Sequence, residues 1–318
     1  MVKLGIIGLG KMGGYHASAC NLIPSVSLIG VADPNPALWE KVKSTKVIKS
    51  KDYRDWIDLV DGVIIATPTD LHYPIAKEIL SLGKHVLIEK PLTKQIDHAK
   101  ELFDIAAQKK CALHIGHVER FNGAVQELKK IIHEPYLIES YRMGPFASRV
   151  QNDTVVLDLM IHDLDIILGI VNSPIKSIST VGNKIKSDKC DIAVVHIAFE
   201  NGTLANIISS RASHIKKRTM SIHQQNEFIE LNFTSQDISI HKHTSESVQV
   251  GHNQLQYKQE ETVERLFVYK DNPLKLEIEH FASSIKSGKN LIDPEQDLSS
   301  LQITLDLEKK VEEIISNG

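Results

Sequence analysis

Three glycines near the start of the chain are spaced as in loops that hold phosphate groups. Gly8, Gly10 and Gly13 lie in the run Gly-Leu-Gly-Lys-Met-Gly. In such a loop the first glycine allows a tight turn, the second lets the backbone approach a pyrophosphate, and the third lets the following helix pack closely. The amide groups of Lys11 and Met12 would point at phosphate from the helix N-terminus. Because this spacing also occurs for structural reasons alone, the elements around it decide its meaning.

Asp33 supports a dinucleotide site, because it lies about 20 residues after the last glycine, where a carboxylate bonds the adenosine ribose hydroxyls. The alternative is an aspartate that caps a turn, which Pro34 and Pro36 would favour. No Arg or Lys follows Asp33 until Lys41, so a 2'-phosphate would meet a carboxylate without a neutralising cation. NAD is therefore expected rather than NADP.

Two further polar clusters follow apolar runs, at the carboxyl ends of expected strands, where ligands bind in open α/β sheets. They are Thr67-Pro68-Thr69 with His72, and Glu89-Lys90-Pro91. A lone lysine after a strand is usually a solvated surface residue. A lysine in a cleft near a cationic nicotinamide would have its charge disfavoured, which suits Lys90 for acid/base work or for orienting a hydroxyl.

A third group of reactive side chains lies in an apolar, helix-like segment over residues 156–168. Asp158 and His162 are four residues apart, so they share a helix face and can address one substrate. Asp165 could instead orient the second nitrogen of His162. No third ligand stands at a recognisable spacing, so no metal is expected. The residues alone leave open whether His162 is catalytic or structural.

The elements that must position these groups alternate in type over the first third of the chain. Apolar runs of the strand type are expected at residues 4–7, 27–32, 62–66, 85–88 and 112–115. Helices are expected between them, at residues 13–22, 36–44, 74–82 and 96–109. Continuous apolar strands separated by helices are typical of a parallel sheet covered on both faces, so the predicted class is doubly wound α/β.

The pattern changes near residue 118, which predicts two domains, 1–118 for NAD and 119–318 for the substrate and oligomerisation. A helix is expected at residues 124–133, then strands at 175–181, 193–199, 203–209, 219–223, 228–233 and 237–241, then helices at 275–287 and 298–316. Asn201-Gly202 is a strong hairpin signal. The second domain is therefore expected to be α+β with a large, mostly antiparallel open sheet.

Composition excludes several other classes of protein. Of the 318 residues, 42% are apolar. The chain has 37 Lys and Arg against 40 Asp and Glu, which gives a net charge of -3. Such a charge provides no overall attraction for nucleic acid or for an anionic membrane. The three cysteines lie far apart, so no disulfide framework or zinc motif is expected. No run approaches the ~20 apolar residues of a membrane span. A cytoplasmic protein is expected.

Taken together, these features resemble the glucose-fructose oxidoreductase / inositol dehydrogenase / MocA (Gfo/Idh/MocA) family. The resemblance rests on the glycine loop with Asp33, on both polar clusters, and on Asp158 followed by His162. It implies a Rossmann domain, an α+β domain, and hydride transfer from a sugar or polyol carbon to NAD. It also implies that Lys90, Asp158 and His162 act on the substrate hydroxyl. The implied cofactor-binding residues are the glycine loop, Asp33, Thr67, Pro68, Thr69, His72, Glu89 and Lys90.

Within that family, the run Gly-His-Val-Glu-Arg-Phe-Asn at residues 116–122 is similar to members that oxidise the 3-hydroxyl of UDP-N-acetylglucosamine. Those members act ahead of an aminotransferase in lipid A (lipopolysaccharide) or surface-glycan synthesis. Gly123 departs from the proline expected there. Arg120 and Asn122 are predicted to bind substrate. Arg211 and Lys217, in the basic run 211–218, could clamp a diphosphate, although such runs are usually solvated faces.

Three hypotheses remain open from the sequence. The first is an NAD-dependent nucleotide-sugar 3-dehydrogenase, and the second is a dehydrogenase of a free polyol or sugar such as inositol. The third is a non-catalytic NAD-sensing or scaffold protein, which the presence of Lys90, Asp158 and His162 disfavours. A large open sheet also predicts a homodimer or homotetramer.

Overall fold

The computed structural model describes residues 1–147, 153–251 and 254–317, and it divides into two compact units. The first unit comprises residues 1–121 and 271–305, and the second comprises residues 122–270 and 306–318. The boundary expected after residue 118 differs from this division, because the chain returns to the first unit. The reason is α6 (Pro273–Ser287), whose buried Ile278 and Phe281 belong to a core cluster of the first unit.

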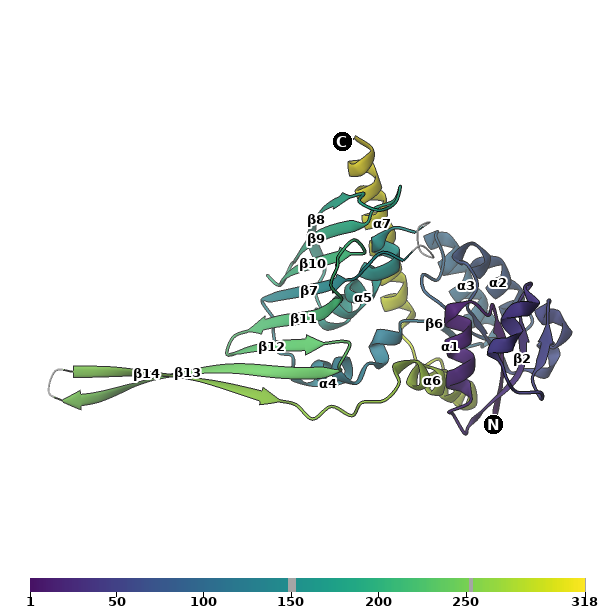
Figure 1. Ribbon diagram of the computed structural model, residues 1–318, viewed down its shortest axis with the longest axis horizontal. Helices are drawn as coiled ribbons and strands as arrows, with labels where there is room; N and C mark the ends of the chain where they lie inside the picture. The colour runs from purple at the N-terminus through teal and green to yellow at the C-terminus, as the bar shows by residue number, and fades with distance from the viewer. Residues whose placement is uncertain (148–152, 252–253, 318) are drawn as a thin grey trace. The chain divides into compact units, whose positions relative to one another are not determined.

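A six-stranded parallel sheet forms the centre of the first unit, in the order β3-β2-β1-β4-β5-β6. Figure 1 labels β2 and β6 of this sheet and the helices α1, α2, α3 and α6 of the same unit. Its strands are β1 (Val2–Ile7), β2 (Val26–Ala32), β3 (Ile48–Ser50), β4 (Gly62–Ile65), β5 (His85–Ile88) and β6 (Leu113–Ile115). Its other helices are α1 (Lys11–Cys20), α2 (His72–Ser81) and α3 (Ile96–Lys109), with short 3-10 turns that include η1 (Pro36–Lys41) and η5 (Val118–Phe121). The strand order reverses between β1 and β4, which is where such sheets bind ligands.

Both faces of this sheet are buried, as the continuous apolar strands predicted. On one face Ile65 and Val86 pack with residues of α2 and α3. On the other face Ile64 and Leu87 pack with residues of α1 and α6. Neighbouring residues of one strand thus enter opposite layers, which a doubly wound sheet requires.

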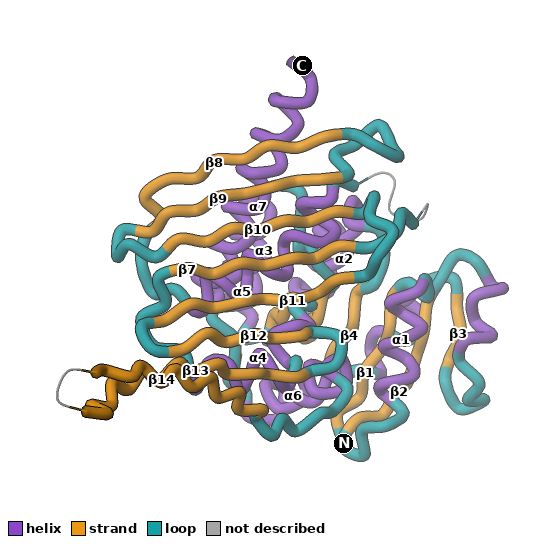
Figure 2. The backbone as a smooth tube through the Cα atoms, turned by 60° about the vertical axis from the view of Figure 1, so that its left-hand side comes forward, coloured by secondary structure: helices purple, strands orange, loops and turns teal. Residues whose placement is uncertain are grey.

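An eight-stranded sheet forms the second unit, in the order β14-β13-β12-β11-β7-β10-β9-β8, and Figure 2 shows it face-on. Only β7 and β10 pair in parallel; every other pair is antiparallel. The strands are β7 (Leu137–Met143), β8 (Ile175–Asn183), β9 (Ile192–Phe199), β10 (Leu204–Ser210), β11 (Lys217–Gln224), β12 (Glu227–Asn232), β13 (Asp237–Gly251) and β14 (Gln254–Arg265). Its helices are α4 (Gly123–Ile131), the π-turn η7 (Val156–Met160), α5 (Ile161–Ile170) and the end of α7 (Pro294–Asn317).

The predicted fold class is confirmed, and so is the hairpin at Asn201-Gly202, where Gly202 has a φ of 89°. The helix expected at residues 36–44 is wrong, because Pro36 begins a short 3-10 turn that ends at Lys41. Strands β3, β7 and β14 were not anticipated. On β7 the buried positions include Ser140 and Arg142, so the strand lacks the apolar alternation that marks a half-buried strand.

Buried Arg142 ties the centre of this sheet to α5. Its Nε donates to Asp163 Oδ2 at 2.8 Å and its Nη2 donates to Oδ1 at 3.0 Å. The guanidinium also lies 4.7 Å from the centre of the Phe233 ring. Because Asp163 follows His162 directly, this bidentate pair fixes α5, which carries His162 and follows the π-turn that carries Asp158.

We expect Asp163→Ala to destabilise the protein by about 3–5 kcal/mol, because Arg142 would remain buried without its counter-charge. Urea unfolding followed by circular dichroism measures this change. Asp188→Ala, which alters an exposed aspartate of the same unit, should change the free energy of unfolding by less than about 0.5 kcal/mol. Equal effects of the two variants would contradict the assignment.

Candidate functional site

The glycine loop lies between β1 and α1 and packs against the end of β4. Gly8 has a φ of +89°, and a Cβ at this residue would lie 2.6 Å from the carbonyl oxygen of Ala66. A Cβ at Gly13 would lie 1.9 Å from the carbonyl oxygen of Gly8. Glycine is therefore required at both positions, by the close approach of three backbone segments.

The N-terminus of α1 fits a pyrophosphate. Gly10 is the N-cap residue and supplies no side chain to the first turn. No described atom lies within 4 Å of a Cβ built at Gly10. The first backbone N–H groups of a helix lack partners within the helix, so those of Lys11 and Met12 can meet the negative charge of a dinucleotide.

Asp33 lies beside this loop and is only 9% exposed. Its Oδ2 accepts a hydrogen bond from the Leu9 N–H at 2.8 Å, and its Oδ1 accepts one from the Asn35 N–H at 2.8 Å. The carboxylate thus caps a turn and also holds the loop. Each oxygen keeps a second lone pair, so the predicted bonds to ribose hydroxyls are compatible with this arrangement.

Lys41 is a residue of this site that the sequence interpretation did not assign. Its Nζ donates to the carbonyl oxygens of Leu9 and Gly10, at 2.7 and 2.8 Å. The ammonium group therefore holds two carbonyl groups of the glycine loop. In the sequence, its role was indicated only by its position as the first cationic residue after Asp33.

His72 joins the two predicted polar clusters at the carboxyl ends of β4 and β5. Its Nδ1 lies 2.9 Å from the carbonyl oxygen of Pro91, and its Nε2 lies 2.9 Å from that of Thr67. Burial lowers the pKa of His72, which favours the neutral ring, and a neutral ring donates one of these bonds at a time. His72 is therefore a bridge within the cluster.

Glu89 forms a partly buried pair with His16, a second residue that the sequence interpretation did not assign. The His16 Nε2 and the Glu89 Oε1 are 2.6 Å apart. Burial opposes ionisation of Glu89, but the hydrogen bond from His16 and the charges of His16 and Lys90 hold its pKa below its usual value. Glu89 is therefore a partly buried anion directly before Lys90 in the chain.

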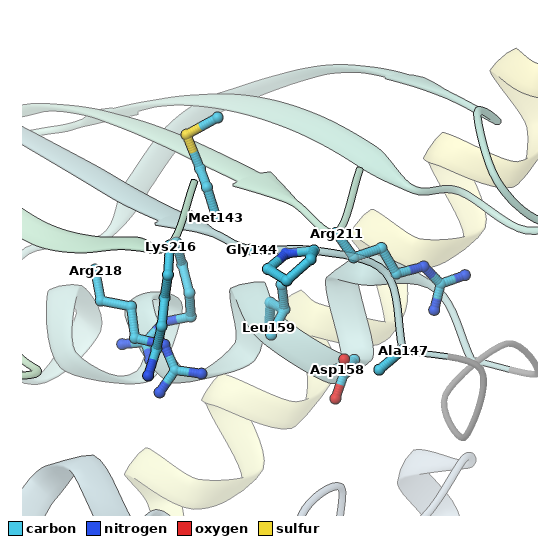
Figure 3. A pocket seen from close by; sticks show the side chains of 10 residues that line it. Met143, Gly144, Ala147, Asp158, Leu159, Arg211, Lys216 and Arg218 are labelled. Carbon is cyan, nitrogen blue, oxygen red and sulfur yellow. The ribbon is translucent and has the colours of Figure 1, made fainter. Parts of the chain in front are cut away.

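In the second unit, Asp158 lies in the π-turn η7 and His162 lies in the first turn of α5. Both are partly exposed. Single π-turns within helices occur frequently at functional sites. Asp158 also lines a cavity of about 150 Å³, together with Lys216 and Arg218 (Figure 3).

The two basic residues chosen from the run 211–218 have other partners. Arg211 is 2% exposed and its Nε donates to Asp191 Oδ1 at 2.7 Å. The Lys217 Nζ lies 3.8 Å from the centre of the Tyr141 ring. Their roles in substrate binding stay predictions. In Figure 3, the guanidinium of Arg211 points away from Lys216 and Arg218.

Arg120 and Asn122 also have structural roles. The Arg120 Nη2 lies 2.7 Å from Asp297 Oδ1, within the first unit. Asn122, in the second unit, caps α4 by accepting from the Ala124 N–H at 3.1 Å. Contacts of Arg120 and Asn122 with a substrate stay predictions.

Two family models match the chain. Residues 2–117 match a model described as "Oxidoreductase family, NAD-binding Rossmann fold". Residues 121–230 match the GFO/IDH/MocA C-terminal domain. Between them, these matches cover the glycine loop, both polar clusters and the segment with Asp158 and His162.

Known relatives support the same grouping. UDP-N-acetylglucosamine 3-dehydrogenase from Acidithiobacillus ferrooxidans is 32% identical over 242 residues, which are 76% of this chain and 77% of that protein. A solved structure of that enzyme superposes with a TM-score of 0.88, at 29% identity, over 98% of both chains. The scyllo-inositol dehydrogenase of Lactobacillus casei, solved with NAD(H) and scyllo-inositol, shares the fold, with a TM-score of 0.79 at 20% identity over 99% of this chain and 98% of that one.

Among the described helices, none combines the length and apolar character that crossing a bilayer requires.

We expect Asp33→Ala to weaken NADH binding about 10- to 100-fold, because a hydrogen bond to a charged group contributes about 1.5–3 kcal/mol. Titration of NADH fluorescence measures the dissociation constant. Asp58→Ala, at an exposed position of the same unit, is the control. An unchanged constant for Asp33→Ala would remove Asp33 from the cofactor site.

Proposed function

Because the chain belongs to the GFO/IDH/MocA family of oxidoreductases, we propose that it is an NAD-dependent sugar dehydrogenase that oxidises the 3-hydroxyl of UDP-N-acetylglucosamine. The observation that carries this proposal is the 32% identity to the Acidithiobacillus ferrooxidans 3-dehydrogenase across three quarters of both chains. The cofactor is NAD, and bound NAD would supply the hydride acceptor.

We assign the proton chemistry to Lys90, Asp158 and His162. His162 accepts the proton of the sugar hydroxyl, since an imidazole has a pKa suited to this step near neutral pH. Lys90 donates a hydrogen bond to the same oxygen and stabilises the negative charge that develops on it. Asp158 holds the adjacent hydroxyl or orients His162.

The diphosphate of the substrate is assigned to Lys216 and Arg218, which line the same cavity as Asp158. Arg142 and Arg211, which are bonded to Asp163 and Asp191, also line this cavity and add positive charge to it. The proposed clamp uses other members of the basic run than Arg211 and Lys217. Cationic side chains form charge-assisted hydrogen bonds with phosphate oxygens.

Oxidation of a free polyol is the alternative. It is favoured by the scyllo-inositol 2-dehydrogenase of Bacillus subtilis, which is 26% identical over 67% of this chain and 68% of that protein. Such a substrate has no diphosphate, so the cations at Lys216 and Arg218 would have no role in its binding.

The wider setting follows from the proposed chemistry. A 3-keto sugar is a substrate for amination, so an aminotransferase is the expected partner, in the cytoplasm, ahead of lipid A or surface-glycan synthesis. A homodimer or homotetramer is expected through the eight-stranded sheet, where Tyr136 and Leu204 are 53% and 49% exposed.

We expect Lys90→Ala and His162→Ala each to slow the hydride step by about 10²- to 10⁴-fold, because each removes a group that handles the hydroxyl proton. Single-turnover formation of NADH, followed by absorbance, measures this step. Lys94→Ala and His196→Ala, which alter a partly exposed lysine and an exposed histidine, should react at the wild-type rate. Wild-type rates in the first pair would refute the assignment.

We expect Lys216→Ala to raise the Michaelis constant for UDP-N-acetylglucosamine about tenfold, through loss of about 1.5 kcal/mol from one charged contact. Steady-state kinetics with UDP-N-acetylglucosamine and with scyllo-inositol separate the two candidate substrates. Lys176→Ala, an exposed lysine of β8, is the matched control. If Lys216→Ala and Lys176→Ala behave alike, the diphosphate is bound elsewhere.

A further inference from the structure

Glu277 is a buried carboxyl group that the proposed mechanism does not use. It lies in α6 on the face that buries Leu274, Ile278 and Phe281, and it is 1% exposed. Among the described residues, none forms a hydrogen bond with either of its carboxyl oxygens. Native proteins leave few buried polar groups without a partner, so this group requires an explanation.

The charged groups around Glu277 come from three other segments of the first unit. Helix α6 packs against α1 and η5, and Glu277 interacts electrostatically with Glu89 and Arg120. His16 of α1 holds Glu89, and Arg120 of η5 is paired with Asp297. The titratable groups near Glu277 are therefore Glu89 and Arg120, together with their partners His16 and Asp297.

Two neighbouring carboxyl groups that are shielded from water do not both ionise, because the two negative charges repel each other. Glu89 is the carboxyl group that ionises more readily, because its Oε1 lies 2.6 Å from His16 Nε2 and Lys90 adds a positive charge. Burial and then the charge of Glu89 raise the pKa of Glu277 well above its usual value, against the opposing charge of Arg120. This direction favours the protonated form of Glu277, which has one O–H group to donate.

The second oxygen of Glu89 is also closely held. A Cβ at Gly116 would lie 3.2 Å from Glu89 Oε2, so this oxygen packs against backbone that carries no side chain. With Oε1 bonded to His16, Oε2 is the acceptor that remains on Glu89 for a donor from α6.

We propose that Glu277 is a protonated positioning residue whose O–H group donates a hydrogen bond to one buried water, and that this water donates a hydrogen bond to Glu89 Oε2. This holds the Glu89 carboxylate between α1 and α6, and Lys90 follows Glu89 directly in the chain. The inference rests on the proposed role of Lys90. A water in this place has a donor in Glu277 and an acceptor in Glu89, which is the polar setting that buried water needs.

The kinetic test compares Glu277→Leu with Glu277→Gln. Leucine removes the donor, so kcat should fall about tenfold while the KM for NAD changes less than threefold. Because leucine also removes a buried polar group, its melting temperature should be at or above that of the wild type. Glutamine restores an N–H donor without charge, so kcat should return to within threefold of the wild type. Glu279→Leu, on the same helix but paired with Lys275, is the control and should keep full kcat.

A second readout needs no substrate. The infrared difference between wild type and Glu277→Gln at pH 7 should contain the carbonyl band of a protonated carboxylic acid that shifts in D₂O. Because the pKa of Glu277 is raised on folding, the wild type should also lose stability relative to Glu277→Gln as the pH rises above 4.5.

The outcomes separate this inference from the proposed function. Absence of the infrared band would overturn the neutral Glu277 whatever the substrate is. Wild-type kcat in Glu277→Leu, or an equally low kcat in Glu277→Gln, would overturn the positioning role. If no turnover occurs on UDP-N-acetylglucosamine in any variant, the proposed substrate fails, and the infrared and stability measurements still decide the state of Glu277.

Discussion

The close approach of three backbone segments at Gly8 and Gly13 is the constraint on which the rest of the first unit depends. The turn after β1 must leave room for the end of β4 and for the start of α1, and a single Cβ at either glycine would overlap a carbonyl oxygen. Because β1 and β4 lie where the strand order reverses, this contact places the N-terminus of α1 at the ligand-binding edge of the sheet.

Around that edge, several polar side chains form hydrogen bonds with backbone groups of the protein itself. Asp33 accepts from an N–H group of the glycine loop, Lys41 donates to two of its carbonyl oxygens, and His72 connects the segments that follow two strands. Such bonds fix the loop before a dinucleotide arrives, so less ordering is left for the binding step. These hydrogen bonds restrict the rotamers of the side chains, and they restrict the loop for the same reason.

The parts of the protein that local pattern controls could be predicted from the sequence. Local pattern was sufficient to predict the apolar strands β4 and β5, the helix that ends before Gly83, and the loop at Gly8. Strand β7 could not be predicted in this way, because Arg142 is buried by a partner 21 residues away. The same limit applies to Arg211, which looks like a ligand-binding cation until Asp191 is placed beside it. His16 pairs with Glu89 across 73 residues only because of how the chain folds, and no short sequence motif predicts this pair.

The π-turn before α5 changes the direction in which side chains before and after it project from the helix axis. A π-turn holds one residue more than an α-turn, and one residue of an α-helix corresponds to a rotation of about 100°. A side chain before η7 is therefore turned about the helix axis relative to a continuous α-helix, and Asp158, at the centre of η7, lies where this change of phase occurs. A homologue that lost one residue here would keep its helix and its fold, yet it would present a different side chain where Asp158 now stands.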